Sequence, residues 1–253
     1  MSTFSRHFDY FQPADPRSVS ACSAPDIYRH GYLAQTFGTH AAVEIISLYG
    51  PAADAMFLYF STDGIPHWQR ANSGPVDWSW QTVDYLFVPA MGFVVPQRLW
   101  RPFSNKLLPS LVHNRTLFPP VFFRRRDYEG VGISLEDAKS DRHECLRGHD
   151  QHVQFGGKTS TSLRILWLGY EEHTRQIQLK DQSAKTKPIT LGRWAKRIAA
   201  ANPTSIVDAE YDPLWRIGAG GITPADITLV GVVQTSAGTW QPLLKVSRLV
   251  DLS

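Results

Sequence analysis

The pattern of apolar and polar positions predicts its clearest elements in the C-terminal half of the chain. Two pairs of short apolar runs occur there, and each pair is separated by a turn that contains glycine, Gly169 in the first and Gly238 in the second. Short glycine-containing turns join neighbouring antiparallel strands. We therefore predict four strands, at residues 163–168, 175–179, 227–234 and 239–246.

One helix is predicted between these two pairs, at residues 191–201. Trp194 and Ile198 are four residues apart, so they lie on the same side of a helix and are expected to pack on the sheet. Thr190 stands at the N-cap position, and Pro203 follows the last turn, where a helix cannot continue.

The N-terminal half gives weaker signals. Residues 1–40 are rich in turn-forming residues, and we expect an extended segment there. The apolar stretches between residues 41 and 60 have the length of either strands or short helices, and their periodicity favours neither. Further strands are predicted at residues 83–88, 92–95 and 121–125.

Residues 137–158 are polar and are predicted to form a mobile loop. Elsewhere the predicted strands outnumber the helices, and the two do not alternate in the order that builds a parallel sheet. The length of 253 residues suits one large domain. The sequence therefore predicts a single α+β domain, residues 1–253, built on a twisted, mostly antiparallel β-sheet with few helices.

Composition is that of an ordinary globular protein, with 43% hydrophobic and 19% charged residues. Residues 1–13 lack the apolar run of a secretory signal, and two cysteines, Cys22 and Cys145, are too few for a disulfide scaffold. The longest nearly apolar run, residues 86–96, is half the length of about twenty residues that a bilayer requires. We therefore expect an intracellular protein, cytoplasmic or nuclear, without a membrane partner.

Several short motifs of the C-terminal half resemble a known group of proteins. They are Gly169-Tyr170, Arg175-Gln176-Ile177, Pro188-Ile189-Thr190, the run from Ala195 to Ala199 and the run from Ser236 to Pro242. Over roughly residues 165–245 the chain is similar to a large group of uncharacterised proteins of basidiomycete fungi. The resemblance implies a fungal origin and carries no activity.

The densest group of chemically active side chains is His143, Cys145, His149 and His152. Structural zinc is held by four nitrogen or sulfur ligands in a tetrahedron, usually contributed by two separate elements. No second pair lies nearby, so a solvated polar loop is the simplest interpretation. The alternative is a hydrolase or transferase that uses zinc, or the thiolate of Cys145 activated by a neighbouring histidine. We expect no cofactor, and zinc is the ion that this group would take.

The motif Phe155-Gly156-Gly157-Lys158-Thr159-Ser160 is similar to the end of a phosphate-binding loop. The full loop requires a glycine where His152 stands, a strand before it and a helix after it. A polar segment precedes this motif and a strand is predicted to follow. We therefore expect no nucleotide site of the P-loop type.

The positive charge of the chain is concentrated in one segment. The net charge is +3, yet residues 85–126 contain seven cations, no acid and eight aromatic residues. Cations bind phosphates, and exposed aromatic rings stack on bases. We therefore predict a contiguous basic surface from this segment. Its candidate binding residues are Arg98, Arg101, Arg124, Arg125 and Arg126.

A second basic group is predicted on the helix at residues 191–201, where Arg193, Lys196 and Arg197 share one face. Lys180, Lys185 and Lys187 extend it along the preceding loop. An aromatic core with a solvated basic rim also explains both groups. The function predicted from the sequence is a non-catalytic binding module whose basic, aromatic-rich face takes nucleic acid or an acidic protein partner.

Three tryptophans, Trp68, Trp78 and Trp80, flank a turn-rich segment. Clustered tryptophans with a nearby carboxylate form cages for methylated cations, and exposed ones form platforms for carbohydrates. Three tryptophans also fill an ordinary core. The sequence leaves these uses open.

Overall fold

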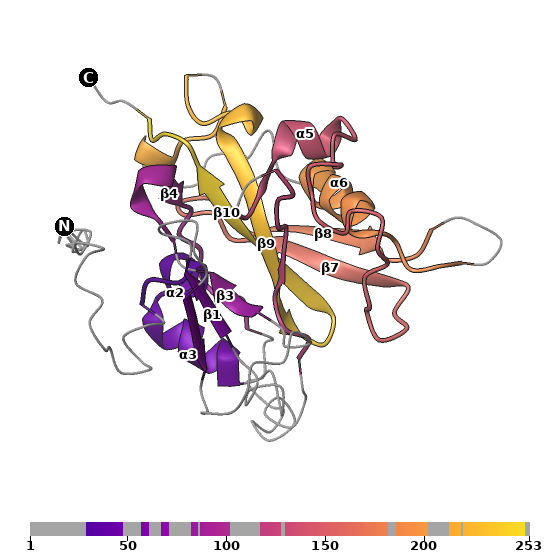
Figure 1. The fold of residues 1–253 in the computed structure, drawn as a ribbon. Helices are drawn as coiled ribbons and strands as arrows, with labels where there is room; N and C mark the ends of the chain where they lie inside the picture. The colour runs from indigo at the N-terminus through magenta and orange to yellow at the C-terminus, as the bar shows by residue number, and fades with distance from the viewer. Residues whose placement is uncertain are drawn as a thin grey trace.

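The computed structural model describes residues 29–47, 57–60, 67–70, 82–85, 87–101, 117–127, 130–181, 186–201, 213–218 and 220–250. Its α-helices in these ranges are α2 (Tyr32–Phe37), α3 (Thr39–Ser47), α5 (Leu135–Lys139) and α6 (Leu191–Ala201). None of the helices described is long and apolar enough to cross a membrane. Figure 1 shows two long strands, β9 and β10, at the centre of the fold.

The main sheet has seven strands in the order β5-β9-β10-β7-β8, with β4 paired to β10 and β6 paired to β9. Every pairing is antiparallel except that of β7 with β10. This arrangement confirms the predicted α+β class and the mostly antiparallel sheet. The strands are β4 (Phe93–Val94), β5 (Val121–Phe122), β6 (Ile133–Ser134), β7 (Ser160–Ile165), β8 (His173–Gln178), β9 (Ile227–Ser236) and β10 (Thr239–Val246).

A smaller sheet lies in the N-terminal half. Its three strands are β1 (Phe57–Phe60), β2 (His67–Arg70) and β3 (Thr82–Tyr85), in the order β2-β1-β3. Strand β1 is antiparallel to β2 and parallel to β3. The two elements left open by periodicity between residues 41 and 60 are therefore one helix, α3, and one strand, β1.

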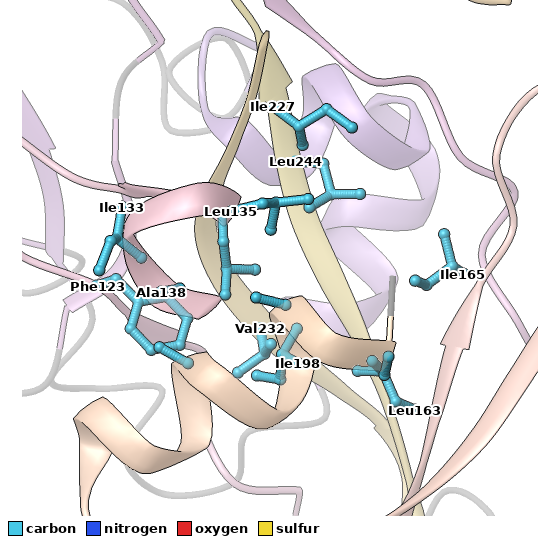
Figure 2. Packing of buried hydrophobic residues seen from close by; sticks show 14 of the residues in the cluster. Phe123, Ile133, Leu135, Ala138, Leu163, Ile165, Ile198, Ile227, Val232 and Leu244 are labelled. Carbon is cyan, nitrogen blue, oxygen red and sulfur yellow. The ribbon is translucent and has the colours of Figure 1, made fainter. Parts of the chain in front are cut away.

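Helices cover both faces of the main sheet at β9 and β10 (Figure 1). Leu229 and Val232 of β9 belong to the apolar cluster that includes α5 and α6. Val230 and Val233 belong to a second cluster, which includes α2 and α3. Successive side chains of a strand point to opposite faces, so the apolar residues between Leu229 and Val233 contribute to both clusters. Figure 2 shows the first cluster, where side chains of α5 and α6 gather against β9 and β10.

Helix α6 begins and packs as the sequence predicts. The N–H of Arg193 donates to the hydroxyl of Thr190 over 3.4 Å, which satisfies one of the unpaired donors of the first turn. Trp194 is 1% exposed and meets Phe155 and Trp240 edge-on, with ring centroids 4.7 and 5.2 Å apart. The apolar face of α6 is therefore fixed in the core, and its polar face is left toward solvent.

Two predictions about loops need correction. Residues 32–40, expected to be extended, lie in α2 and the start of α3. Residues 137–158, expected to be a mobile loop, include part of α5 and are anchored by backbone hydrogen bonds, from Arg147 to Arg124 and from Val153 to Ile189. Leu146 is completely buried in this segment. Ala138 and Phe155 are buried in the same cluster, so a few apolar residues among polar ones hold the segment against the core, and composition does not reveal it.

Candidate functional site

Helix α6 carries three cations on its polar face, and they have different surroundings. Arg193 is exposed, and no hydrogen bond joins its guanidinium to any group in the ranges described. The ammonium of Lys196 forms an ion pair with Asp141. The guanidinium of Arg197 donates to the backbone carbonyls of Gln178 and Lys180. Of the three, Arg193 is the one with its charge available to a partner.

Arg197 has a structural role at the end of the main sheet. Strand β8 is the terminal strand, so one row of its backbone groups lacks a neighbouring strand. The bond from Arg197 satisfies the carbonyl of Gln178 in that row. Burial lowers the pKa of Arg197, and the positive charge of Arg193 adds to this effect. The guanidinium is thus partly removed from water, and it satisfies a backbone carbonyl at the edge of the sheet.

Two further segments add cations beside α6. The guanidinium of Arg175 in β8 donates to the carbonyl of Ala200, near the C-terminal end of the helix, over 3.5 Å. Lys180 pairs through its backbone with Pro188, and the backbone N–H of Lys187 donates to Asp181 over 2.9 Å. We call the resulting face the α6 surface. It consists of Arg175, Lys180, Lys187, Arg193, Lys196 and Arg197, with the acids Asp141, Asp150 and Asp181.

The acids of the α6 surface only partly neutralise it. The hydrogen bond from Lys196 holds the pKa of Asp141 below its usual range, so this carboxylate stays ionised beside its partner. Asp150 lies at the N-terminal end, between His149 and Gln151, whose carbonyls accept the first N–H groups of α6. Arg193 and Lys187 are both exposed and keep the positive charge that the acids do not cancel. The sequence prediction named the same cations except Arg175, and Lys185, which it also named, lies outside the described residues.

The basic segment of residues 85–126 does not stay together in the fold. Arg101 forms an ion pair with Glu44 of α3 over 2.5 Å, in the layer of α2 and α3. The backbone of Arg126 instead donates to Cys145, in the loop that packs beside α5 and α6. These contacts place the two halves of the segment in different layers, which argues against the single contiguous surface we predicted. Arg98, Arg124 and Arg126 are exposed, whereas Arg125 is paired with Asp127 over 2.8 Å.

The described aromatic residues of the same segment are divided between the core and the surface, where Phe93 and Phe118 are exposed. Tyr85, Phe122 and Phe123 are buried, so they offer no stacking surface. Trp100 is half-buried, and the guanidinium of Arg164 lies over its ring at 4.4 Å from the centroid. Arg164 is also paired with Glu172. No sequence signal connects Trp100 with Arg164, because the two residues are distant along the chain. The contact forms only when β7 and the segment after β4 lie side by side in the fold.

The four expected metal ligands are not brought together. His152 donates from Nδ1 to the carbonyl of Pro188 over 2.5 Å, so its ring contacts the segment before α6. His143 and His149 are neighbours, with ring centroids 5.7 Å apart. Within the described ranges, no group of three His, Cys, Asp or Glu side chains is placed to hold one metal ion. The described residues therefore provide no set of ligands that supports the zinc hypothesis.

The His143 ring has a packing role that explains its position. It lies against Gly192 in the first turn of α6, where an added Cβ would come within 2.7 Å of the ring carbon Cγ. The carbonyl of His149 accepts the N–H of the same glycine over 2.8 Å. The two histidines thus hold the start of α6, and Gly192 is the residue that permits the contact.

Cys145 does not have the surroundings of a nucleophile. Burial raises the pKa of its thiol, and the positive charge of Arg125 opposes this only in part. Its Sγ lies 3.6 Å from the carbonyl of Arg142, an acceptor that favours the protonated thiol. A reactive cysteine requires the opposite, a pKa lowered by positive charge and exposure. These surroundings do not favour the alternative in which Cys145 acts as a thiolate.

Two sequence predictions concern other segments. Gly156 and Gly157 both have positive φ, 58° and 78°, and the chain continues into β7, so a strand follows this turn as predicted. Trp68 lies in β2, paired with Tyr59 through the backbone. Trp78 and Trp80 lie outside the described residues, so the aromatic cage stays a prediction.

Comparison with known proteins gives no match for this chain, whether with models of protein families, with curated proteins or with solved structures.

Proposed function

We propose that this chain is a non-catalytic binding protein that uses the α6 surface to hold the phosphate backbone of a nucleic acid. One observation carries the proposal. Three segments that contact one another, β8, the loop before α6 and α6 itself, contain six cations and three acids, and the cations Lys187 and Arg193 are exposed. All six cations lie within residues 175–197, and a phosphate backbone is a polyanion that matches such a basic group.

The mode of binding follows from what the α6 surface contains. The exposed Arg193 presents a planar guanidinium, which pairs with phosphate oxygens in two parallel hydrogen bonds. Trp194, the aromatic residue of α6, is buried. The surface therefore offers cations without a stacking ring, which favours contacts to phosphates over contacts to bases. We expect binding that depends strongly on salt and little on sequence.

The enzyme alternative has less support. The raised pKa of Cys145 disfavours a thiolate, and the described residues contain no three-ligand metal group. An acidic protein is the alternative partner for the same surface, since carboxylates also pair with arginine. The two partners differ in their salt dependence, because a polynucleotide releases condensed counterions when its phosphates are neutralised.

The test is a titration of the protein with labelled RNA and DNA duplexes of unrelated sequences, at several salt concentrations. We expect a linear fall of log K with log salt. The double variant Lys187→Gln with Arg193→Gln should make this line less steep, by roughly 0.7–0.9 in slope for each phosphate that the variant can no longer bind. Arg98→Gln is the matched control, because Arg98 is also exposed but does not belong to the α6 surface. Its backbone carbonyl accepts a hydrogen bond from the side chain of Gln241 in β10.

Three outcomes contradict the proposal. The wild-type protein would bind neither polymer at low salt, or the double variant would bind as well as wild type, or Arg98→Gln would weaken binding while the double variant would not. If no polymer binds but an acidic polypeptide such as polyglutamate does, and the double variant abolishes that, the surface takes acidic protein instead.

A further inference from the structure

The outer edge of strand β8 presents backbone groups that no strand pairs within the described ranges. Strand β8 is the last strand of the main sheet, and it pairs there with β7. Antiparallel neighbours exchange backbone hydrogen bonds at every second residue. The N–H of Leu179, just after β8, donates to the carbonyl of Thr159, just before β7, over 2.7 Å. The odd-numbered residues of β8 therefore bond to β7, and the N–H and carbonyl groups of Thr174 and Gln176 point away from it.

Two contacts on opposite sides of the β7–β8 pair give the same alternation. The N–H of Ser162 donates to the carbonyl of Gly238 over 2.9 Å, so the even-numbered residues of β7 bond away from β8 and the odd-numbered ones bond toward it. On the far side, the guanidinium of Arg197 donates to the carbonyl of Gln178, which is the next outward-pointing residue of β8. The direction of the backbone groups at the edge thus follows from two independent observations.

This edge is open between its two ends. In the part of the chain that the structure describes, no backbone hydrogen bond crosses the edge at Thr174 or Gln176, and both residues are exposed. The amide of Gln176 donates to the hydroxyl of Ser160 in β7 over 2.9 Å, so this side chain lies across the sheet and not beyond its edge. Strand β8 contains no proline, and its register with β7 is regular. An edge without a proline or a bulge accepts a further strand.

The charge at this edge identifies the kind of strand that fits. Arg175 is exposed, and its guanidinium reaches a carbonyl of α6, on the side of the sheet that α6 covers. Arg197 reaches the same edge from α6. The acids nearest in sequence, Glu171, Glu172 and Asp181, lie before or after β8 and not within it. A second copy of β8 would bring its own arginines to this edge and be repelled, whereas an acidic strand is attracted.

We propose that the outer edge of β8 binds an extended acidic segment of a partner protein as an additional strand of the main sheet. The backbone of that segment pairs with the N–H and carbonyl groups of Thr174 and Gln176. Successive side chains of a strand point to opposite faces, so every second residue of the segment is acidic and lies on the side of Arg175 and Arg197. A nucleic acid has no peptide groups to pair in this way. The site therefore goes beyond the phosphate binding proposed for the α6 surface and does not depend on it.

Amide hydrogen exchange, followed by NMR on the whole protein, tests the pairing residue by residue. The probe is a short peptide of alternating threonine and glutamate with blocked ends. In the free protein, the N–H groups of Arg175 and Ile177 should exchange slowly, because β7 pairs with them, and those of Thr174 and Gln176 should exchange fast. The peptide should slow exchange severalfold or more at Thr174 and Gln176 and leave it unchanged at Arg175 and Ile177.

Two variants of one residue separate backbone pairing from the loss of a side chain. Gln176→Pro removes the outward N–H, which the pairing with β7 does not use, and proline is tolerated at such positions of an edge strand. Gln176→Ala is the matched control, because it also loses the bond to Ser160 and keeps the N–H. We expect Gln176→Pro to weaken binding of the peptide by about tenfold or more, and Gln176→Ala to stay within about twofold of wild type. Circular dichroism checks that both variants are folded.

A change in the probe gives the same test without altering the protein. In the paired peptide the threonines lie on the face of Thr174 and Gln176, so their N–H groups are the ones that bond to β8. The same peptide with N-methyl groups on its threonines keeps the charge and loses these donors, so it should not bind. A peptide of alternating threonine and lysine keeps the donors and reverses the charge, and it should bind at least severalfold more weakly.

Four results would overturn the proposal. They are unchanged exchange at Thr174 and Gln176 with the acidic peptide present, equal binding of the N-methylated peptide, equal binding of the lysine peptide, and a dimer of the wild-type protein that Gln176→Pro dissociates. The last result would make a second copy of the chain the occupant of the edge. Gln176→Pro leaves every cation of the α6 surface in place, so nucleic-acid binding should persist in this variant. The two proposals therefore fail separately.

Discussion

Gly31 and Asp84 are in such close contact that Gly31 has no room for a side chain. A Cβ at Gly31 would overlap the carboxylate of Asp84, with its Cγ 2.7 Å away. The carboxylate accepts the N–H of Leu33 over 3.2 Å and the N–H of Tyr85 over 2.8 Å. Asp84 comes from β3 and Leu33 from α2, so a side chain of the smaller sheet caps helix α2.

We expect Gly31→Ala to destabilise the protein through this contact alone. The backbone of Gly31 is extended, with φ of −77° and ψ of 158°, so alanine adopts it without strain. The added methyl group must instead displace a buried carboxylate, and overpacking of this kind costs about 1–3 kcal/mol of the free energy of unfolding. Denaturation by urea measures the change.

Gly238→Ala is the control for that experiment. Gly238 lies in the turn between β9 and β10, and a Cβ there would have no atom within 4 Å. Its stability should stay close to that of wild type. Equal stability of Gly31→Ala and wild type would show that the contact with Asp84 is not formed.

Asp84 should also make stability depend on pH. The carboxyl group is 1% exposed, and burial raises its pKa to about 8, although three backbone N–H groups oppose the shift. The pKa of the folded state thus exceeds the unfolded value of 3.8, so folding favours the protonated acid. The stabilisation is complete below pH 3.8 and is lost as the pH rises toward 8.

Asp84→Asn isolates this effect, because the amide keeps an oxygen that accepts the N–H of Leu33 and does not titrate. The stability of wild type relative to the variant should fall steadily between pH 4 and 8. A difference between the two proteins that is the same at every pH would contradict the buried acid. Urea denaturation at four or five pH values is sufficient.

The sequence was most informative for strands and helices whose pattern and end signals lie within the element or next to it. The bounds of α6 and β10 were predicted to the residue, because α6 has an amphipathic pattern and both elements have clear end signals, such as Thr190 and Gly238. Helix α2 was missed because six residues carry little periodicity and its cap, Asp84, lies 51 residues from Leu33.

The candidate site was predictable only in part for the same reason. The cations of α6 share a face that helical spacing defines, so Arg193, Lys196 and Arg197 were found together. Their pairing with Asp141 and with the carbonyl of Gln178 depends on segments that are distant in sequence, and only Arg193 stays exposed and without a hydrogen bond in the described structure. Net charge along a segment likewise does not tell which face each residue reaches, as Arg101 and Arg126 show.

The turn before β9 should depend on Asp226. Its carboxylate accepts both the N–H and the hydroxyl of Thr223, over 2.8 and 2.7 Å, and pairs with Arg248 over 2.8 Å. The bond with Arg248 lowers the pKa of Asp226 to about 2. Removal of a capping side chain costs about 0.5–2 kcal/mol, and we expect a decrease of this size for Asp226→Ala at pH 7.

The effect of Asp226→Ala should shrink in acid. The folded pKa lies below the unfolded value of 3.8, so the ionised carboxylate stabilises the fold above pH 3.8 and the contribution is lost as the pH falls toward 2. Wild type and variant should therefore converge in stability at pH 2. A gap that stays constant from pH 7 to pH 2 would exclude the ion pair as its source. Thermal unfolding followed by circular dichroism measures both proteins.

Two substitutions on α6 separate its packing face from its binding face. Trp194 is 1% exposed and touches Phe155 and Trp240, so Trp194→Ala should lower the free energy of unfolding by about 3–5 kcal/mol. Arg193, its neighbour in sequence, is exposed, so Arg193→Gln should change stability by less than about 0.5 kcal/mol. If the α6 surface binds phosphates, Arg193→Gln should nevertheless weaken nucleic-acid binding at low salt. Lys196→Gln provides the comparison, because its charge is already paired with Asp141 and its removal should affect binding less. A stable Trp194→Ala variant would contradict the buried face, and equal binding by wild type and Arg193→Gln would exclude Arg193 from the interface.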